Sequence, residues 1–229
     1  MSTSIFTDFI NLTFPNCCFH CNRYIEEEKY ICKKCFNLLD KTEYHKNSKT
    51  NELYQFVKKY IKIENAFSLY YYRDFGVLQT LMHQLKYFNK KNIGIWLGEI
   101  YGKTLIEETN FNFDLIIPIP LHKKRKIERG YNQSEMIVKG LNKYLKCEIS
   151  TSAVCRITNT VSQTTKKRNE RRIDLKGAFK VSNKNILENK HILLVDDIIT
   201  TCSTIIECAE TIKKSVKCKI SICSIGRTM

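Results

Sequence analysis

The run from His191 to Thr204 constrains the fold of this chain more than any other stretch. Its apolar residues 192–195 predict a short buried strand of a parallel sheet. Two adjacent carboxylates, Asp196 and Asp197, close that strand, and a loop of small residues follows. The next residues repeat apolar side chains at the spacing of one helix face: Ile205, Ile206, Ala209 and Ile212.

A strand, a small-residue loop and a helix N-terminus together form an anion site, because unpaired backbone N–H groups and the positive helix end point at the loop. The loop residues are Thr200, Thr201, Cys202, Ser203 and Thr204. Paired carboxylates before such a loop can accept hydrogen bonds from two neighbouring hydroxyls, as on a ribose. The run therefore predicts a site for a phosphate beside a sugar diol. The plainer alternative is an ordinary strand and turn ending in acids.

Charge and cysteine usage limit the function classes. The 229 residues suffice for one good-sized domain and a small appendage, and no apolar stretch is long enough to span a membrane. Residues 1–16 lack the features of a signal peptide, so we expect a cytoplasmic protein with reduced cysteines. A net charge of +15 favours a polyanionic partner, although scattered lysines alone can produce it.

Two C-x₂-C pairs lie near the N-terminus, ten residues apart, and predict a structural Zn²⁺ site. The expected ligands are Cys18, Cys21, Cys32 and Cys35. Cys17 and His20 are competing ligands, but Cys17 would make an unfavoured C-x₃-C pair, and His20 is interpreted as a surface residue. Four protein ligands leave no open metal position for catalysis.

Apolar patterning organises the rest of the chain. Strands are expected at residues 66–72, 114–120, 192–195 and 218–225, and helices around 78–88, 96–105, 136–145 and 205–212. Strands that alternate with helices predict an α/β fold with a doubly wound parallel sheet. The expected domains are a zinc module over residues 1–45, a linker or helix over 46–64 and the larger domain over 65–229, with residues 41–50 as the main linker.

Two basic loops stand out. The first follows the strand that ends at Pro118 and Pro120, so it lies at the same sheet edge as the acidic pair. It carries Lys123, Lys124, Arg125, Lys126 and Arg129, and could hold a pyrophosphate group. The second, residues 163–172, has no apolar face and is interpreted as a mobile loop that could act as a lid. Either could also be an ordinary solvated basic loop.

The acidic run resembles the phosphoribosyl pyrophosphate motif of type I phosphoribosyltransferases, except that Cys202 stands where that family usually has glycine. Further motifs resemble the ComF family, whose members are competence-associated proteins with a zinc finger and a phosphoribosyltransferase domain. The motifs are Leu85-Lys-Tyr87, Pro118-x-Pro120, Arg129-Gly-Tyr-Asn-Gln133, Arg156, Gln163, Arg168-Asn169, Gly177-Ala-Phe179 and Val195-Asp-Asp197, together with the two cysteine pairs. The resemblance covers nearly the whole chain.

The resemblance implies a role for each motif. Asp196 and Asp197 would hold the ribose hydroxyls and serve catalysis, and residues 200–204 would hold the 5′-phosphate. Residues Lys123, Lys124, Arg125 and Arg129 would face pyrophosphate, with Mg²⁺ held chiefly by the ligand. The candidate nucleic-acid contacts are Lys126, Tyr131, Lys166, Lys167, Arg168, Arg171 and Arg172.

Two functions follow from this resemblance. The first is a competence protein that supports single-stranded DNA import from the inner face of the membrane, peripherally through partners in the uptake machinery. Exposed aromatics such as Tyr131 would stack on bases. Phosphoribosyl pyrophosphate would then be a regulatory or vestigial ligand. The alternative is an active transferase that acts on an unidentified nucleobase or nucleotide. No aromatic hood for base recognition stands out in the sequence, which favours the first.

Overall fold

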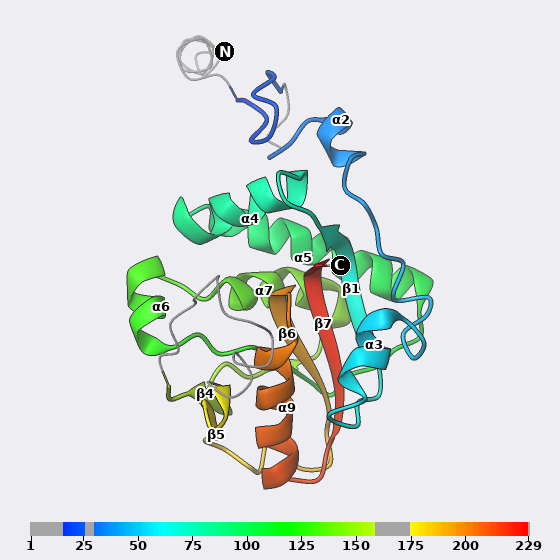
Figure 1. Cartoon of the computed structure of the whole chain (residues 1–229), viewed down its shortest axis with the longest axis vertical. Helices are drawn as coiled ribbons and strands as arrows, with labels where there is room; N and C mark the ends of the chain where they lie inside the picture. Colours follow the sequence, from blue (N-terminus) through cyan, green and yellow to red (C-terminus); the bar gives the residue numbers. More distant parts are fainter. Residues whose placement is uncertain (1–15, 26–29, 159–174, 229) are drawn as a thin grey trace, which may run out of the picture.

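A five-stranded parallel sheet is the centre of the computed structural model (Figure 1), which describes residues 16–25, 30–158 and 175–228. Its strand order is β1-β7-β6-β2-β3, and every neighbouring pair is parallel. The strands are β1 Ala66–Tyr72, β2 Leu115–Pro118, β3 Glu148–Ile149, β6 His191–Ile199 and β7 Lys219–Thr228. A separate antiparallel hairpin pairs β4 Val154–Arg156 with β5 Phe179–Val181.

Helices cover both faces of the sheet, as predicted for an α/β fold. Successive side chains of a strand point to opposite faces, and the two hydrophobic cores follow this alternation. Leu193 and Val195 of β6 pack on one face, with helices α4 Val77–Tyr87, α5 Lys91–Glu108 and α7 Gln133–Leu145. Ile192 and Leu194 pack on the other face, with α3 Glu52–Val57 and α9 Ser203–Ser215. The expected strands and helices are all present, and β6 and β7 extend further than the sequence indicated.

Helices α5 and α7 approach each other closely because glycines line their contact. A Cβ on Gly98 would lie 2.2 Å from the carbonyl oxygen of Ile137, and one on Gly140 would lie 2.0 Å from that of Ile95. No side chain fits in those gaps. The close contact fixes α7, whose first turn reaches the carboxyl edge of the sheet.

The cysteine module packs on α4 and α5 and shares their core. Cys18, Ile31 and Cys35 belong to the same buried cluster as the helices on that face. The module includes the short helix α2 Lys33–Phe36. Trp96 of α5 contacts Tyr30 and Phe36, with ring centroids 5.4 and 6.1 Å apart. Through these contacts the cysteine module shares a hydrophobic core with the larger domain.

His20, which was interpreted as a surface residue rather than a metal ligand, lies outside the cysteine cluster and is partly covered by α4. Its imidazole is half-buried, and its Nδ1 lies 3.0 Å from Oγ1 of Thr80 on α4. No local pattern predicted that this knuckle faces a helix. His20 thus adds a polar contact between the module and α4.

Residues 41–50, predicted as the main linker, are partly buried against the sheet. Thr42, Tyr44, His45 and Ser48 are buried, and the backbone N–H of Thr42 donates to Leu69 of β1. Buried polar groups need partners, and the side-chain amide of Asn51 donates to the carbonyl oxygens of this segment and of Ala66. The segment is polar because it hydrogen-bonds along the edge of the sheet.

The first basic loop is largely helical. Residues Lys123–Arg129 form α6, which the sequence analysis treated as a loop. The helix begins after His122, whose Nδ1 accepts from the backbone N–H of Lys124, and ends at Gly130 with a φ of 74°. Glycine adopts this left-handed conformation at no steric cost. In the part of the chain that the structure describes, no helix is long and apolar enough to span a membrane.

Candidate functional site

The acidic pair lies at the carboxyl edge of the sheet, where β6 carries it beyond the core. Asp196 and Asp197 are themselves residues of β6, whose pairing with β7 continues to Ile199. The backbone N–H of Asp197 donates to Oδ1 of Asp196 over 2.9 Å. The hydroxyl of Ser134, in the first turn of α7, donates to the same oxygen over 3.3 Å. Both acids are half-buried, so one side of the pair faces the open edge of the sheet.

Burial raises the pKa of Asp196 to about 7, and the neighbouring charge of Asp197 adds to the rise. Hydrogen bonds from Asp197 and Ser134, and the charge of Lys86, act in the opposite direction. Asp196 therefore exchanges a proton near neutral pH, whereas Asp197 has its own counter-ion. Such perturbed carboxyls concentrate at functional sites.

That counter-ion is Lys86, whose Nζ lies 2.7 Å from Oδ2 of Asp197. Burial lowers the pKa of Lys86, but attraction to Asp197 and Asp196 outweighs it, and the net pKa is raised. Lys86 was quoted as part of a motif and was not predicted as a site residue. No local signal could have placed it there, because helix α4 lies across the carboxyl edge of the sheet (Figure 1), and only the tertiary fold decides that.

The predicted phosphate loop joins β6 to α9. Residues 200–204 line a small hollow of about 30 Å³ together with Asp196. Cys202 has a φ of 63°, so the loop adopts the left-handed conformation that glycine would favour, with cysteine in its place. Among the described residues, no side chain caps the N-terminus of α9. The N–H groups of its first turn are therefore oriented toward the hollow.

Arg227 fixes the start of this loop. Its guanidinium donates to the carbonyl oxygen of Ile199 over 3.3 Å and to that of Thr200. The hydroxyl of Thr201 donates to that of Ser203 over 3.1 Å. Arg227 lies near the end of β7 and was not predicted, because nothing near it in the sequence indicates a catalytic role.

The basic residues of α6 lie at the carboxyl edge of the sheet, and they divide into two groups that face different parts of the site. Lys123 and Lys126 line a cavity of about 220 Å³, which Arg156 of the β4–β5 hairpin also borders. Nζ of Lys126 lies 2.8 Å from Glu135, which partly neutralises its charge. Lys124 is exposed, and Arg125 is close enough to Arg156 to help lower the pKa of that guanidinium, after burial, which is the larger cause.

Arg129 points away from this cavity, toward α4. Its Nη1 donates to Gln133 over 2.9 Å, and its guanidinium carbon lies 5.7 Å from the ring centre of Tyr87. The charge of Arg129 also acts on Lys86, so Arg129 faces the acidic pair from the α4 side. The predicted cations therefore divide between the cavity at Arg156 and the α4 side of the site.

Tyr131 is not the exposed aromatic that was predicted to stack on bases. It is 5% exposed, its hydroxyl donates to the carbonyl oxygen of Leu85, and burial raises its pKa. Its role is to attach the turn after α6 to α4, close to Lys86. The other nucleic-acid candidates of the second basic loop lie outside the described residues: Lys166, Lys167, Arg168, Arg171 and Arg172.

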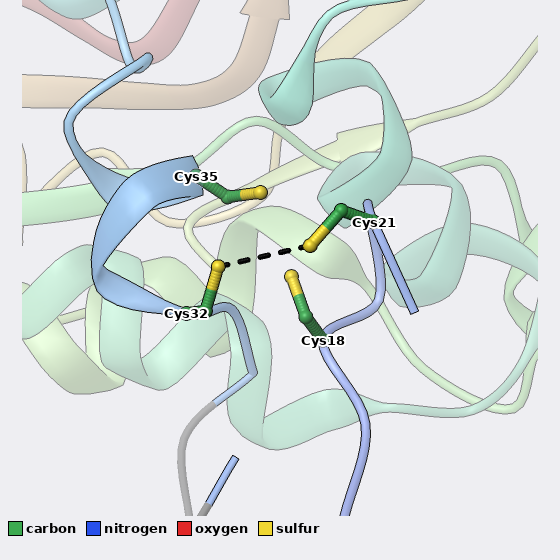
Figure 2. Close-up of side chains that lie close together, drawn as sticks. All are labelled: Cys18, Cys21, Cys32 and Cys35. Carbon is green, nitrogen blue, oxygen red and sulfur yellow. Dashed lines mark hydrogen bonds between the residues drawn. The ribbon is translucent and has the colours of Figure 1, made fainter. Parts of the chain in front are cut away.

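The four predicted zinc ligands come together in a single cluster, which Figure 2 shows in close-up. The sulfur atoms of Cys18, Cys21, Cys32 and Cys35 all lie within 4.8 Å of one another. Those of Cys21 and Cys32 are 3.7 Å apart. A tetrahedron of Zn–S bonds near 2.3 Å has sulfur atoms about 3.8 Å apart. Cys17 is outside the cluster and pairs through its backbone with Tyr24.

The thiols of the cluster differ in acidity, and two of them have a lowered pKa. Burial would raise the pKa of Cys18, but backbone N–H groups, first that of Cys21, lower it to about 6. A backbone hydrogen bond with Cys35 is the main reason that the pKa of Cys32 is lowered. Burial and the neighbouring thiols raise the pKa of Cys35. Thiolates crowded this closely need a cation between them, so the cluster can hold a metal ion such as zinc.

A parallel sheet whose β6 strand delivers an acidic pair and a hydroxylated loop to a helix N-terminus defines a domain of the phosphoribosyltransferase type. The family model of the phosphoribosyl transferase domain matches residues 132–227. The solved structure of the allosteric regulatory enzyme of purine biosynthesis resembles 60% of this chain at 14% identity and a TM-score of 0.38, and the match spans 29% of that structure.

Relatives indicate the particular family. The chain is 29% identical over 156 residues to the DNA utilization protein YhgH of Escherichia coli O157:H7, across 66% of this chain and 68% of the relative. It is 33% identical over 115 residues to competence protein F of Haemophilus influenzae, across 50% of each chain. This chain is thus similar to proteins of the ComF/YhgH family, which have a phosphoribosyltransferase domain.

Proposed function

We propose that this chain is a ComF-type competence protein that binds phosphoribosyl pyrophosphate with Mg²⁺ and supports the import of single-stranded DNA in the cytoplasm. The observation that supports the ligand best is the acidic pair beside the loop at the N-terminus of α9, with Lys86 as counter-ion. Carboxylates suit a sugar diol, and free N–H groups at a helix N-terminus suit its phosphate. The match of the phosphoribosyl transferase domain to residues 132–227 supports the same ligand.

Each part of the ligand has a proposed partner. Asp196 and Asp197 accept hydrogen bonds from the ribose hydroxyls, and residues 200–204 bind the 5′-phosphate. The cations Lys123, Lys124, Arg125 and Arg129 attract the pyrophosphate. Mg²⁺ is bound mainly through oxygens of the ligand, as is common for this ion. Four thiolates hold a structural Zn²⁺ in the cysteine module, with no open position for catalysis.

Calorimetric titration of Mg²⁺–phosphoribosyl pyrophosphate into the zinc-replete protein tests this site. We expect saturable binding to the wild type and its loss in the double variant Asp196→Asn/Asp197→Asn. Glu148→Gln is the matched control, because this exposed carboxylate lies at the opposite edge of the sheet. A folded wild type that shows no binding would mean that the site no longer takes this ligand.

The DNA part of the proposal has two supports. Relatives bear the names competence protein and DNA utilization protein, and the net charge of +15 favours a polyanionic partner. Binding through cations that displace counter-ions must weaken steeply with salt. We therefore expect the logarithm of the affinity for single-stranded DNA to fall linearly with the logarithm of the salt concentration. An affinity independent of salt would exclude the basic surface as the DNA site.

A second candidate function is an active phosphoribosyltransferase. The observation that favours it is a cavity of about 550 Å³ beside Lys86, lined partly by the aromatic rings of Tyr72 and Tyr87. Its size lies in the range of small-molecule pockets. Release of pyrophosphate on addition of nucleobases or nucleotides would establish this activity. No release with any acceptor, from protein that binds the ligand, would leave a binding function alone.

A further inference from the structure

Helix α4 exposes a group of aromatic side chains beside the acidic pair. Tyr87 is 64% exposed and Phe88 55% exposed, and His83 is also exposed. The ring of His83 lies 4.9 Å from that of Tyr87 and 5.4 Å from that of Phe88. We call these three residues the α4 aromatic patch. Large aromatic side chains are normally buried, so an exposed cluster of them indicates a binding surface.

The patch is connected to the phosphoribosyl site through two cations. Lys86, the residue before Tyr87, binds Asp197 over 2.7 Å and lines the same cavity as His83 and Tyr87. The guanidinium of Arg129 lies 5.7 Å from the ring centre of Tyr87, and Gln133 holds it from the other side. A planar ligand that stacks on Tyr87 would therefore lie next to the proposed ribose site.

Charge around the patch selects an anionic partner. The sequence has no acidic residue between Asp74 and Glu99, while Lys86, Lys90 and Lys91 lie in that interval. The lysines that follow Phe88 are exposed. Exposed rings bordered by the exposed cations Lys90 and Lys91 suit the two parts of a single-stranded nucleic acid. The bases stack on aromatic faces, and the phosphates follow the positive charge.

We infer that the α4 aromatic patch is a stacking site for bases of single-stranded nucleic acid, so that the strand passes directly beside the phosphoribosyl site. This inference rests on the proposed function, and it names the surface and the mode of contact that the proposal leaves open. Tyr87 carries the stack and Phe88 extends it, and Arg129 and the lysines bind the backbone. The α4 aromatic patch takes the stacking role that the sequence analysis assigned to Tyr131, because Tyr131 is buried.

Fluorescence anisotropy with two probes of equal length tests this inference. One probe is an oligothymidylate of about 20 nucleotides, longer than the stretch that one small binding fold covers. The other is an abasic deoxyribose-phosphate strand, which has the same charge and no base. We expect Tyr87→Ala to weaken the oligothymidylate complex by about 5- to 150-fold, the range for one lost base stack, and to leave the abasic complex unchanged.

Two variants serve as controls. Tyr87→Phe keeps the ring and should retain the wild-type affinity. Tyr144→Ala removes a ring that is 39% exposed near the C-terminal end of α7, away from the acidic pair, and should have no effect. Because Tyr87 is largely exposed, its replacement by alanine should not unfold the protein.

The outcomes separate this inference from the proposed function. If the wild type binds both probes and Tyr87→Ala changes neither complex, or weakens both equally, base stacking on α4 is refuted while DNA binding stands. If the wild type binds neither probe, the DNA part of the proposed function fails and the inference fails with it. A loss confined to the base-bearing probe supports the inference.

Discussion

Asp196 is predicted to reduce the stability of the fold at neutral pH, and Asp196→Asn should therefore stabilise the protein. In the folded chain, burial and the adjacent Asp197 raise its pKa from 3.8 to about 7. A carboxyl whose pKa is raised on folding contributes stability below its unfolded pKa and loses that contribution as pH rises through its folded value. The loss thus falls between about pH 4 and pH 7.

The size of the effect follows from the shift. At about 1.4 kcal/mol for each pKa unit, the raised pKa of Asp196 lowers the free energy of unfolding by about 4 kcal/mol at pH 8 and by about 2 kcal/mol at pH 5, where the unfolded chain is ionised and the folded chain is still protonated. Asparagine has no charge to bury and retains a carbonyl oxygen for the donors of Asp197 and Ser134. The stabilisation by Asp196→Asn should therefore grow by about 2–3 kcal/mol between pH 5 and pH 8.

Urea denaturation of wild type and variant at both pH values measures this difference directly. Comparing the two proteins at each pH cancels the titration of all other groups that the substitution does not affect. Asp114→Asn is a useful control, because this carboxyl is exposed and lies at the opposite edge of the sheet. A difference between wild type and Asp196→Asn that is the same at pH 5 and pH 8 would refute the reasoning.

Four further predictions concern the site and its supports. Lys86→Met should lower the free energy of unfolding by about 2 kcal/mol, because it leaves Asp197 without its counter-ion, and the loss should shrink in an Asp197→Asn background. Cys202→Gly should keep the affinity for Mg²⁺–phosphoribosyl pyrophosphate within about twofold in calorimetry, since the loop already has a left-handed residue there; a large change would mean that the thiol itself shapes the loop. Gly140→Ala should destabilise the fold by about 3 kcal/mol or more in urea, because its Cβ would overlap a backbone carbonyl of α5. Removal of metal from the cysteine cluster by a chelator should change the fluorescence of the single tryptophan, which contacts the module, and an unchanged spectrum would mean that the module docks without metal.

Local patterns predicted most of this fold. The strand at residues 192–195, the helix after it and the cysteine spacing each depend on neighbours close in the chain, where periodicity and ligand spacing carry the information. The acidic pair and its loop were recognised for the same reason. The four cysteines predicted as zinc ligands also come together in one cluster. Residues 41–50 show a limit of local patterns, because buried polar groups that hydrogen-bond to β1 cannot be told from an exposed loop in a sequence.

The orientation of side chains was decided by tertiary structure. Tyr131 and Tyr87 are both tyrosines near basic residues, yet one is buried and the other exposed, because α4 lies across the end of the sheet and covers the first. The same placement brings Lys86 to Asp197, although 111 positions separate them along the chain. The sequence by itself determined that the acidic pair, the small-residue loop and the helix N-terminus follow one another, since these parts of the site are contiguous in the chain. Only packing between distant segments could determine which cation pairs with the acids and which aromatic rings remain open to solvent.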